Sequence, residues 1–479
     1  MSVAKTPREL LIGGVWAPAA DGATMPVHDP STGTVLCDVA DGTPEDGARA
    51  LQAAVAAQDE WAAAAPRLRS EILRAAYELI MAREDDLAEL INLEMGKPFA
   101  EARGEVRYAA EFFRWFSEEA VRVGGDFGRT PDGQTRMLVM KQPVGPCLLI
   151  TPWNFPLAMG TRKIGPAIAA GCTMVLKPAP QTPLSSLALA AILMEAGLPA
   201  GVLNVVTTSK AGEVIEPLLR GGHVRKLSFT GSTQTGRILL QQCAATVVRT
   251  SLELGGNAPF IVFPDADLDV AVESAMQAKM RNMGEACTAA NRMFVHEDIA
   301  VAFTSRLAAR MHALRAGTDV GPLIDASAVT KVAHLVQDAA SRGARIVTGG
   351  KPVDGPAFYF EPTVLDGVPA DAELLRTEIF GPVAAVQTFR DFGEVVARAN
   401  DTEWGLVAYV ISQDIDRALT AAERLQAGMV GVNTGLVSNP AAPFGGVKQS
   451  GLGREGGRTG IEEFLDVKYI AIPVREVTR

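Results

Sequence analysis

The spacing of hydrophobic positions changes along the chain and predicts two kinds of local structure. Between residues 44 and 117, hydrophobic residues recur at helical spacing among Ala, Glu and Arg, which predicts several amphipathic helices. From Gly145 onward, short hydrophobic runs alternate with helix-like stretches such as residues 185–195. This alternation is typical of a parallel sheet with helices on both faces.

The hydrophobic runs fall into two series, which predict two α/β domains with a boundary near Gly255-Gly256. The chain has 479 residues, more than one hydrophobic core usually holds, so several domains are expected. The first series of predicted strands covers residues 147–150, 173–176, 203–206, 226–229 and 250–254, and the second covers residues 260–262, 293–295, 344–347, 384–388, 407–411 and 429–432.

Two segments fit neither series. Residues 121–145 are rich in glycine and turn-forming residues and become strand-like at Met137-Leu138-Val139-Met140, while residues 464–473 alternate apolar and polar positions like an edge strand. An exposed strand edge can pair with another chain. We therefore expect these two segments to form an oligomerisation arm; the alternative is a hairpin that packs on its own domain.

Composition narrows the functional class. The formal net charge of −10 argues against nucleic acid and anionic membranes as partners. No apolar run is long enough to span a bilayer, and the N-terminal residues lack an apolar signal region. The five cysteines show no C-x-x-C pair, which indicates a reducing, cytoplasmic environment. The five histidines are scattered, so no metal site is expected.

A cysteine and a glutamate suggest covalent chemistry on a carbonyl group. Cys287 follows Gly284 and precedes Thr288, a plausible helix start, where the helix dipole would lower the pKa of the thiol and favour the nucleophilic thiolate. Glu253 ends an apolar strand before Leu254 and a double glycine, where its carboxylate could activate water. The alternatives are a cysteine that serves as a small buried hydrophobe and a strand-end acid in an ion pair.

Two loops add candidates for binding. Asn154 lies in Thr151-Pro152-Trp153-Asn154-Phe155-Pro156, a stiff loop after a buried strand, and its NH₂ could stabilise an oxyanion. The segment Phe229-Thr230-Gly231-Ser232 follows a strand and precedes a helix expected at Arg237, where a pyrophosphate could bind. By contrast, residues 451–456 match G-x-G-x-x-G without the strand before it or the βαβ unit after it, so we treat that match as chance.

Taken together, these residues resemble the aldehyde dehydrogenase superfamily over essentially the whole chain. Several rare motifs in one order are more specific than any one of them. The motifs are Pro152-Trp153-Asn154-Phe155-Pro156, Lys177-Pro178-Ala179, Phe229-Thr230-Gly231-Ser232, Glu253-Leu254-Gly255-Gly256, Gly284-Glu285-Ala286-Cys287, Glu378-Ile379-Phe380-Gly381-Pro382 and Pro443-Phe444-Gly445-Gly446.

The resemblance implies a fold and an assembly. The expected fold class is α/β, with two doubly wound domains and a small β arm, in a homodimer or homotetramer. A Rossmann-like NAD(P)-binding domain would comprise residues 1–122 and 144–255, and a catalytic domain residues 256–458. The oligomerisation arm would comprise residues 123–143 and 459–479.

The resemblance also implies roles for single residues. Cys287 looks like the nucleophile, Glu253 like the base that hydrolyses a thioester, and Asn154 with the Cys287 backbone N–H like the oxyanion hole. A family branch that passes the acyl group to coenzyme A lacks the acid at position 253, so hydrolysis is expected. The residues that look like nicotinamide-cofactor contacts are Trp153, Lys177, Pro180, Gly231, Ser232, Glu378 and Phe380.

Within the superfamily, the chain looks most like the succinate-semialdehyde dehydrogenases. That subgroup holds the substrate carboxylate with two arginines and a serine, which match Arg162, Arg281 and Ser438, and arginine grips a carboxylate through two parallel hydrogen bonds. The expected reaction oxidises succinate semialdehyde to succinate. Three alternatives stay open: glutarate semialdehyde as the substrate, another aldehyde, or a catalytically silent protein on the same scaffold. The arginines could also be ordinary ion-pair residues.

Three positions depart from the pattern of relatives. Glu285 stands where most have glutamine, and it could raise the pKa of the Cys287 thiol or point away. Ala289 replaces a second cysteine found in this subgroup, so no redox-switch disulfide is expected. Pro180 replaces a glutamate common in NAD-preferring relatives; nothing at Pro180 repels a 2′-phosphate, and Lys177 and Lys210 could attract one. We therefore favour NADP over NAD.

Overall fold

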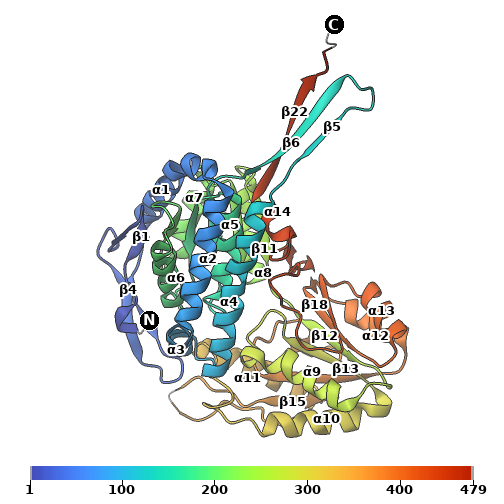
Figure 1. Cartoon of the computed structure of the whole chain (residues 1–479). Helices are drawn as coiled ribbons and strands as arrows, with labels where there is room; N and C mark the ends of the chain where they lie inside the picture. The colour runs from blue at the N-terminus through green and yellow to red at the C-terminus, as the bar shows by residue number, and fades with distance from the viewer. Residues whose placement is uncertain (1–2, 356, 476–479) are drawn as a thin grey trace.

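Two large mixed sheets, each covered by helices on both faces, make up most of the molecule (Figure 1). A computed structural model describes residues 3–355 and 357–475. Within those residues, no helix is both long and apolar enough to cross a membrane. The predicted fold class, two doubly wound α/β units with an added small β sheet, is confirmed.

The first sheet has the strand order β2-β1-β9-β8-β7-β10-β11-β21. Its five central strands are parallel: β9 (Leu203–Val205), β8 (Met174–Lys177), β7 (Cys147–Ile150), β10 (Lys226–Thr230) and β11 (Arg249–Glu253). Antiparallel strands close both edges: β1 (Leu10–Ile12) and β2 (Val15–Ala17) on one side and β21 (Gly451–Leu452) on the other.

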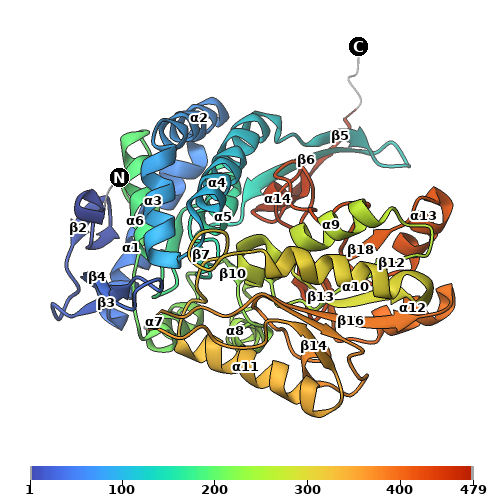
Figure 2. The same ribbon diagram turned by 90° about the horizontal axis from the view of Figure 1, so that it is seen from below.

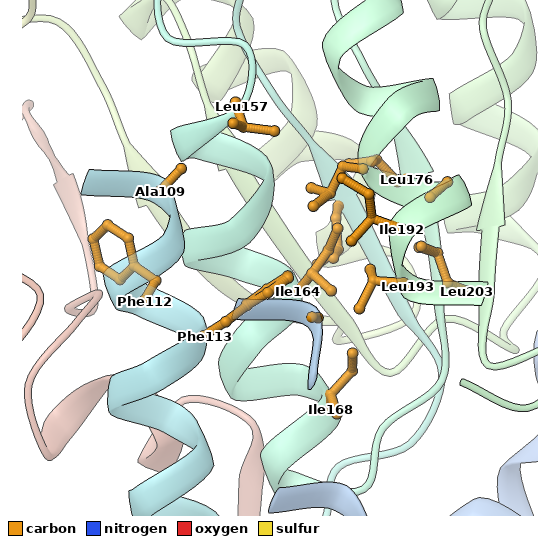
Figure 3. Close-up of a cluster of buried hydrophobic side chains, with 14 of the residues drawn as sticks. Ala109, Phe112, Phe113, Leu157, Ile164, Ile168, Leu176, Ile192, Leu193 and Leu203 are labelled. Atoms are coloured by element: carbon orange, nitrogen blue, oxygen red, sulfur yellow. The ribbon is translucent and has the colours of Figure 1, made fainter. Parts of the chain in front are cut away.

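Alternating side chains of these strands pack into two separate hydrophobic cores. Cys147 and Leu149 of β7 pack under helices α2 to α6, while Leu148 and Ile150 pack under α1, α7 and α8. Figure 3 shows part of the first core, where Phe113, Ile164 and Ile192 come from three different helices. The helices are α1 (Pro44–Ala63), α2 (Pro66–Ala82), α3 (Glu84–Met95), α4 (Phe99–Glu119), α5 (Ala158–Ala170), α6 (Leu184–Glu195), α7 (Ala211–Arg220) and α8 (Thr233–Ala244).

The second sheet has the order β14-β15-β16-β13-β12-β18-β19 and is parallel except for β14. Helices α9 and α10 lie side by side over one face (Figure 2), and α12 and α13 pack on the other. The strands are β12 (Ala258–Val262), β13 (Ala290–His296), β14 (Arg345–Thr348), β15 (Thr363–Asp366), β16 (Val383–Phe389), β18 (Val407–Ile411) and β19 (Met429–Val432); the helices are α9 (Leu268–Met280), α10 (Glu297–His312), α11 (Ala326–Ser341), α12 (Phe392–Asn400) and α13 (Ile415–Arg424).

A three-stranded sheet projects from the body (Figure 1). Strand β6 (Thr135–Pro143) pairs antiparallel with β5 (Asp126–Arg129) on one side and with β22 (Leu465–Pro473) on the other, so the two segments that fitted neither series do pair with each other. The remaining elements are short: β3 (Thr24–His28), β4 (Val35–Ala40), β17 (Trp404–Gly405), β20 (Val447–Lys448), α14 (Thr459–Glu462), and the 3-10 turns η1 (Val3–Lys5), η2 (Ala120–Arg122), η3 (Arg281–Gly284) and η4 (Glu373–Leu375).

Candidate active site

A cavity of about 330 Å³ opens where the loops after β7, β10 and β11 meet the second sheet. Strand β7 has β8 on one side and β10 on the other, so the connections after β7 and β10 diverge and leave a crevice at their carboxyl ends. Such a switch point is where open α/β sheets bind ligands. The residues predicted from the sequence that line this cavity are Trp153, Asn154, Arg162, Gly231, Ser232, Glu253, Arg281, Cys287, Glu378, Phe380 and Ser438.

Two predicted residues lie outside this lining. Pro180 borders a neighbouring cavity of about 470 Å³, and both cavities are lined by Ile324, Asp325 and Ser327. Lys177, at the end of β8, is buried and forms no ion pair with any residue that the structure describes, and burial lowers its pKa to about 8. A buried ammonium without a carboxylate is suited to an oxygen-rich ligand.

Cys287 lies in a turn that leads into β13, so the prediction that it starts a helix is wrong. The predicted drop in the pKa of its thiol is wrong too. Burial raises the pKa to about 12; Arg162 opposes this rise, while Glu378 and Glu253 add to it. Without a helix dipole, the thiolate depends on nearby cations and on what binds in the cavity.

The backbone before Cys287 is tightly wound. Asn282 and Met283 both have φ of 54°, in the left-handed region, and Gly284 follows with φ of 76°. A Cβ on Gly284 would lie 2.2 Å from the Gly381 carbonyl oxygen, so only glycine fits there. The side chain of Asn282 holds this shape by donating to the Glu285 carbonyl oxygen at 2.9 Å and to the Asn154 carbonyl oxygen at 3.1 Å.

Asn154 is held against the same turn. Its Nδ2 donates to the Glu285 carbonyl oxygen at 2.9 Å, which leaves the second hydrogen of the amide free of that bond. The backbone N–H of Cys287 donates to no acceptor in the described part of the chain. The two donors predicted for an oxyanion hole therefore lie in the lining of one cavity, on two loops that are tied together.

Glu253 stands at the end of β11 with neither carboxylate oxygen hydrogen-bonded within residues 3–355 and 357–475. Burial raises its pKa well above the usual value, and Glu455 adds to the rise, while Arg162 and Lys163 oppose it. In its ionised form, a carboxylate in a cavity wall can accept a proton from water.

Glu455 is the neighbour that the sequence interpretation missed. It lies in the G-x-G-x-x-G match of residues 451–456, in which β21 pairs antiparallel with β11 and sets Gly451 opposite Glu253. The two oxygens of Glu455 lie 2.5 Å from Arg162 Nε and 2.5 Å from Lys163 Nζ. As expected, the match is not a dinucleotide fingerprint. The segment instead supplies a buried acid whose partner Lys163 lies 292 positions away, too far for sequence spacing to pair the two residues.

The two candidate arginines have different surroundings. Arg162 is 2 % exposed, is paired with Glu455, and lies 3.7 Å from the ring centroid of Phe444. Arg281 makes no ion pair within the described residues, and its Cζ lies 5.1 Å and 5.7 Å from the ring centroids of Phe155 and Tyr108. Ser438 is half-buried on the same wall. Arg281 therefore presents the more available positive charge.

The cavity lining also includes residues expected to meet a nicotinamide cofactor. The rings of Trp153 and Phe380 meet edge to face at 5.3 Å, and Glu378 accepts from the Gly256 N–H at 3.1 Å. Ser232 caps α8, which begins at Thr233 and not at Arg237 as expected, and its Oγ accepts from the Thr235 N–H at 3.2 Å. A capped helix start beside Gly231 fits a diphosphate.

Glu285 does not face the nucleophile. Its Oε1 accepts from the backbone N–H of Ile324 at 3.1 Å, and burial raises its pKa well above the usual value. The sequence left open whether this acid raises the pKa of the Cys287 thiol or points away, and the structure shows that it points away. Further lining residues that the sequence did not indicate are Tyr108, Met159, Asp325 and Lys331, while Phe444 belongs to one of the motifs noted in the sequence.

The chain matches known proteins in sequence and in fold over most of its length. The model of the aldehyde dehydrogenase family matches residues 16–470. The chain belongs to the aldehyde dehydrogenase family. It is 58% identical to a succinate-semialdehyde dehydrogenase of Paenarthrobacter nicotinovorans (91% of this chain, 99% of the relative) and 51% identical to a glutarate-semialdehyde dehydrogenase of Pseudomonas putida (98% of each). The crystal structure of an E. coli NADP-dependent enzyme superposes with a TM-score of 0.96 at 49% identity, over 98% of both chains.

Proposed function

We propose that this aldehyde dehydrogenase oxidises succinate semialdehyde to succinate, with NADP as the favoured cofactor. The observation that carries the proposal is Arg281, which lines the cavity of Cys287 without an ion partner among the described residues. An unpaired guanidinium at that place fits an aldehyde with a carboxylate at its far end. The similarity to a succinate-semialdehyde dehydrogenase supports the same substrate.

The first half of the reaction is acylation of Cys287. The thiolate attacks the aldehyde carbon, and the carbonyl electrons move to the oxygen, where the amide of Asn154 and the Cys287 N–H can stabilise the negative charge. A nicotinamide cofactor in this cavity would supply the acceptor for the hydride that the tetrahedral adduct loses as it collapses, which would leave a thioester on Cys287. Arg281, Ser438 and Nη2 of Arg162, which has no hydrogen-bond partner within the described residues, would hold the distant carboxylate.

The second half is hydrolysis of the thioester. Glu253 takes a proton from a water molecule, the resulting hydroxide attacks the thioester carbon, and the carbon–sulfur bond breaks to release succinate and the thiolate. Burial and Glu455 favour the protonated form of Glu253, whereas Arg162 and Lys163 favour the carboxylate that the base requires. Glu455 balances these two cations and is therefore coupled to the base.

The cofactor would lie along Trp153, Gly231, Ser232, Glu378 and Phe380, with Lys177 and Pro180 toward its ribose. The buried ammonium of Lys177, without an ion pair in the described part of the chain, and the uncharged Pro180 suit a ribose that carries a 2′-phosphate. The E. coli structure at 49% identity is that of an NADP-dependent enzyme, which supports the same preference.

Glutarate semialdehyde is the second candidate substrate, because a relative at 51% identity acts on it and one methylene is worth only about 1–3 kcal/mol of discrimination. The test follows NADP and NAD reduction with succinate semialdehyde, glutarate semialdehyde and butanal. We expect the highest kcat/KM with succinate semialdehyde and NADP. Equal kcat/KM for butanal would refute the carboxylate site, and a preference for the longer substrate would replace succinate with glutarate.

We also propose the domain boundaries and the assembly expected from the sequence: a cofactor domain of residues 1–122 and 144–255, a catalytic domain of residues 256–458, and an arm of residues 123–143 and 459–479. The arm exposes large apolar side chains, with Phe127 71% and Val467 66% exposed, which favours burial against a second copy. Light scattering coupled to gel filtration should give a dimer or tetramer, and a monomer would refute the assembly. The cytoplasmic location stays a prediction.

A further inference from the structure

Three charged residues at the start of α4 lie behind the active site without touching its cavity. Lys97 precedes the helix, and Glu101 and Glu105 follow one helical turn apart, so their side chains project from one face. Lys97 is 1% exposed and Glu105 3% exposed. Buried ion pairs cost more in desolvation than surface pairs and are weak evidence for stability. The buried position of Lys97 and Glu105 is therefore better explained by a role other than stability.

The buried pair Lys97–Glu105 holds the loop that carries Asn154. Lys97 Nζ donates to Glu105 Oε2 at 2.5 Å and to the Asn154 carbonyl oxygen at 2.8 Å, and it lies 4.1 Å from the ring centroid of Phe155. The other oxygen of Glu105 accepts from the backbone N–H groups of Leu157 and Ala158, at 3.0 Å and 3.1 Å. The loop is thus bonded to this pair both at Asn154 and where it enters α5.

Glu101 holds the loop that carries Cys287. Its Oε2 accepts from the backbone N–H of Asn282 at 2.6 Å, at the first of the left-handed residues. The Asn282 side chain then donates to the Asn154 carbonyl oxygen, the same atom that Lys97 binds. One face of α4 therefore reaches both loops that form the candidate oxyanion hole.

The turn before α4 is itself fixed against the second domain. Gly96 has φ of +88°, and a Cβ there would lie 2.7 Å from Pro322 and 2.9 Å from Pro30. Asn92 Nδ2 donates to the Lys97 carbonyl oxygen at 2.7 Å. From this fixed start, α4 runs toward the arm (Figure 1). The charged residues are therefore anchored independently of the loops that they contact.

We propose that Lys97, Glu101 and Glu105 are positioning residues that hold Asn154 and the Cys287 backbone at the spacing needed to stabilise an oxyanion. This role rests on the proposed function of Cys287 and Asn154, but not on the identity of the aldehyde. The three residues stay out of the cavity and act on acylation by fixing where the two donors stand.

The test compares Glu105→Gln in two backgrounds, the natural chain and Asn154→Ala. The substituted side chain would keep one acceptor but turn an NH₂ toward either Lys97 or the two backbone N–H groups. The readout is the burst of p-nitrophenolate from p-nitrophenyl acetate without cofactor, which reports attack of Cys287 on a carbonyl. In the natural background, we expect Glu105→Gln to slow the burst about tenfold, because complete removal of an oxyanion donor lowers the rate about 10²- to 10³-fold. In the Asn154→Ala background, we expect Glu105→Gln to leave the already slowed burst unchanged. Equal slowing in both backgrounds would overturn the proposal.

Two further variants separate positioning from folding. Lys226→Met removes a buried lysine at the far end of β10, where it pairs with Glu463, and should lower the melting temperature while leaving the burst unchanged. Glu101→Gln keeps an acceptor for the Asn282 N–H and should retain the natural rate, while Glu101→Ala should slow it; identical rates for these two would also overturn the proposal.

The same assay distinguishes the two proposals from each other. A burst in the natural chain without oxidation of succinate semialdehyde would defeat the proposed substrate only. A burst that Glu105→Gln leaves unchanged, in a chain that oxidises the semialdehyde, would defeat only the positioning role.

Discussion

Asn154 and Glu253 line the same cavity around Cys287 from the ends of two strands of one sheet, yet their surroundings differ. Asn154 is bonded through its amide to Glu285 and through its carbonyl to Lys97 and Asn282. The carboxylate of Glu253 has no hydrogen bond in the part of the chain that the structure describes, and is surrounded by charges. A donor that stabilises an oxyanion must be fixed before the charge develops, whereas a base must reach a water molecule. The fixed amide of Asn154 therefore suits stabilisation of the oxyanion that forms during acylation, and the carboxylate of Glu253 suits activation of water for hydrolysis.

Glu253→Gln should separate the two steps most strongly. Without the base, turnover should fall about 10²- to 10⁴-fold while the first hydride transfer still occurs. Stopped-flow absorbance at 340 nm should then show a full burst of one NADPH per site followed by a very slow phase. Loss of the burst together with turnover would show that Glu253 also serves acylation.

Asn154→Ala should give the opposite pattern. The loss of one oxyanion donor should slow the burst itself about 10²- to 10³-fold. Attack of hydroxide on the thioester also forms an oxyanion on the same oxygen, so hydrolysis should slow as well. The same stopped-flow experiment checks this prediction. A normal burst with slow turnover would mean that Asn154 serves hydrolysis and not acylation, and would contradict the difference in role between Asn154 and Glu253.

Arg281→Met tests the substrate end of the cavity. Removal of an unpaired guanidinium should lower kcat/KM for succinate semialdehyde about 10- to 100-fold and leave butanal nearly unchanged, because a hydrogen bond to a charged group contributes about 1.5–3 kcal/mol. The matched variant Arg162→Met should lower kcat/KM for both aldehydes and reduce stability, since it removes one of the two cations that pair with the buried Glu455. Equal losses for both aldehydes in Arg281→Met would remove Arg281 from the carboxylate site.

Glu455→Gln should shift the pH dependence of hydrolysis. Glu455 helps to raise the pKa of Glu253, and its removal also frees Arg162 and Lys163 to favour the carboxylate, so both changes lower the pKa of Glu253. Because hydrolysis needs the ionised base, the turnover rate rises with pH through that pKa, and the midpoint should move to lower pH by about one unit. A midpoint that stays or moves upward would contradict the coupling.

The parts that could be predicted from the sequence are those set by local pattern or rare motifs. Strands such as Cys147–Ile150 and Val407–Ile411 were correctly placed because both of their faces are buried and their sequence is continuously apolar. The contacts of Glu455 with Lys163 and of Lys97 with Asn154 could not be placed, because these partners are remote in sequence and only tertiary packing brings them together. The thiol pKa of Cys287 was predicted in the wrong direction because a turn into β13 was taken for a helix start.

The smallest effect is expected at Glu285, the acid closest to the nucleophile in sequence. Its carboxyl faces the Ile324 N–H, so Glu285→Gln should leave alkylation of Cys287 by iodoacetamide within about twofold at every pH. In both proteins the alkylation rate should rise about tenfold per pH unit between about pH 7 and 9, because the thiol titrates only near 12 and the thiolate is the reacting form. A faster reaction in the glutamine variant alone would mean that Glu285 does act on the thiol. The turn that binds Asn154 would then act on Cys287 through the charge of Glu285 as well as through its geometry.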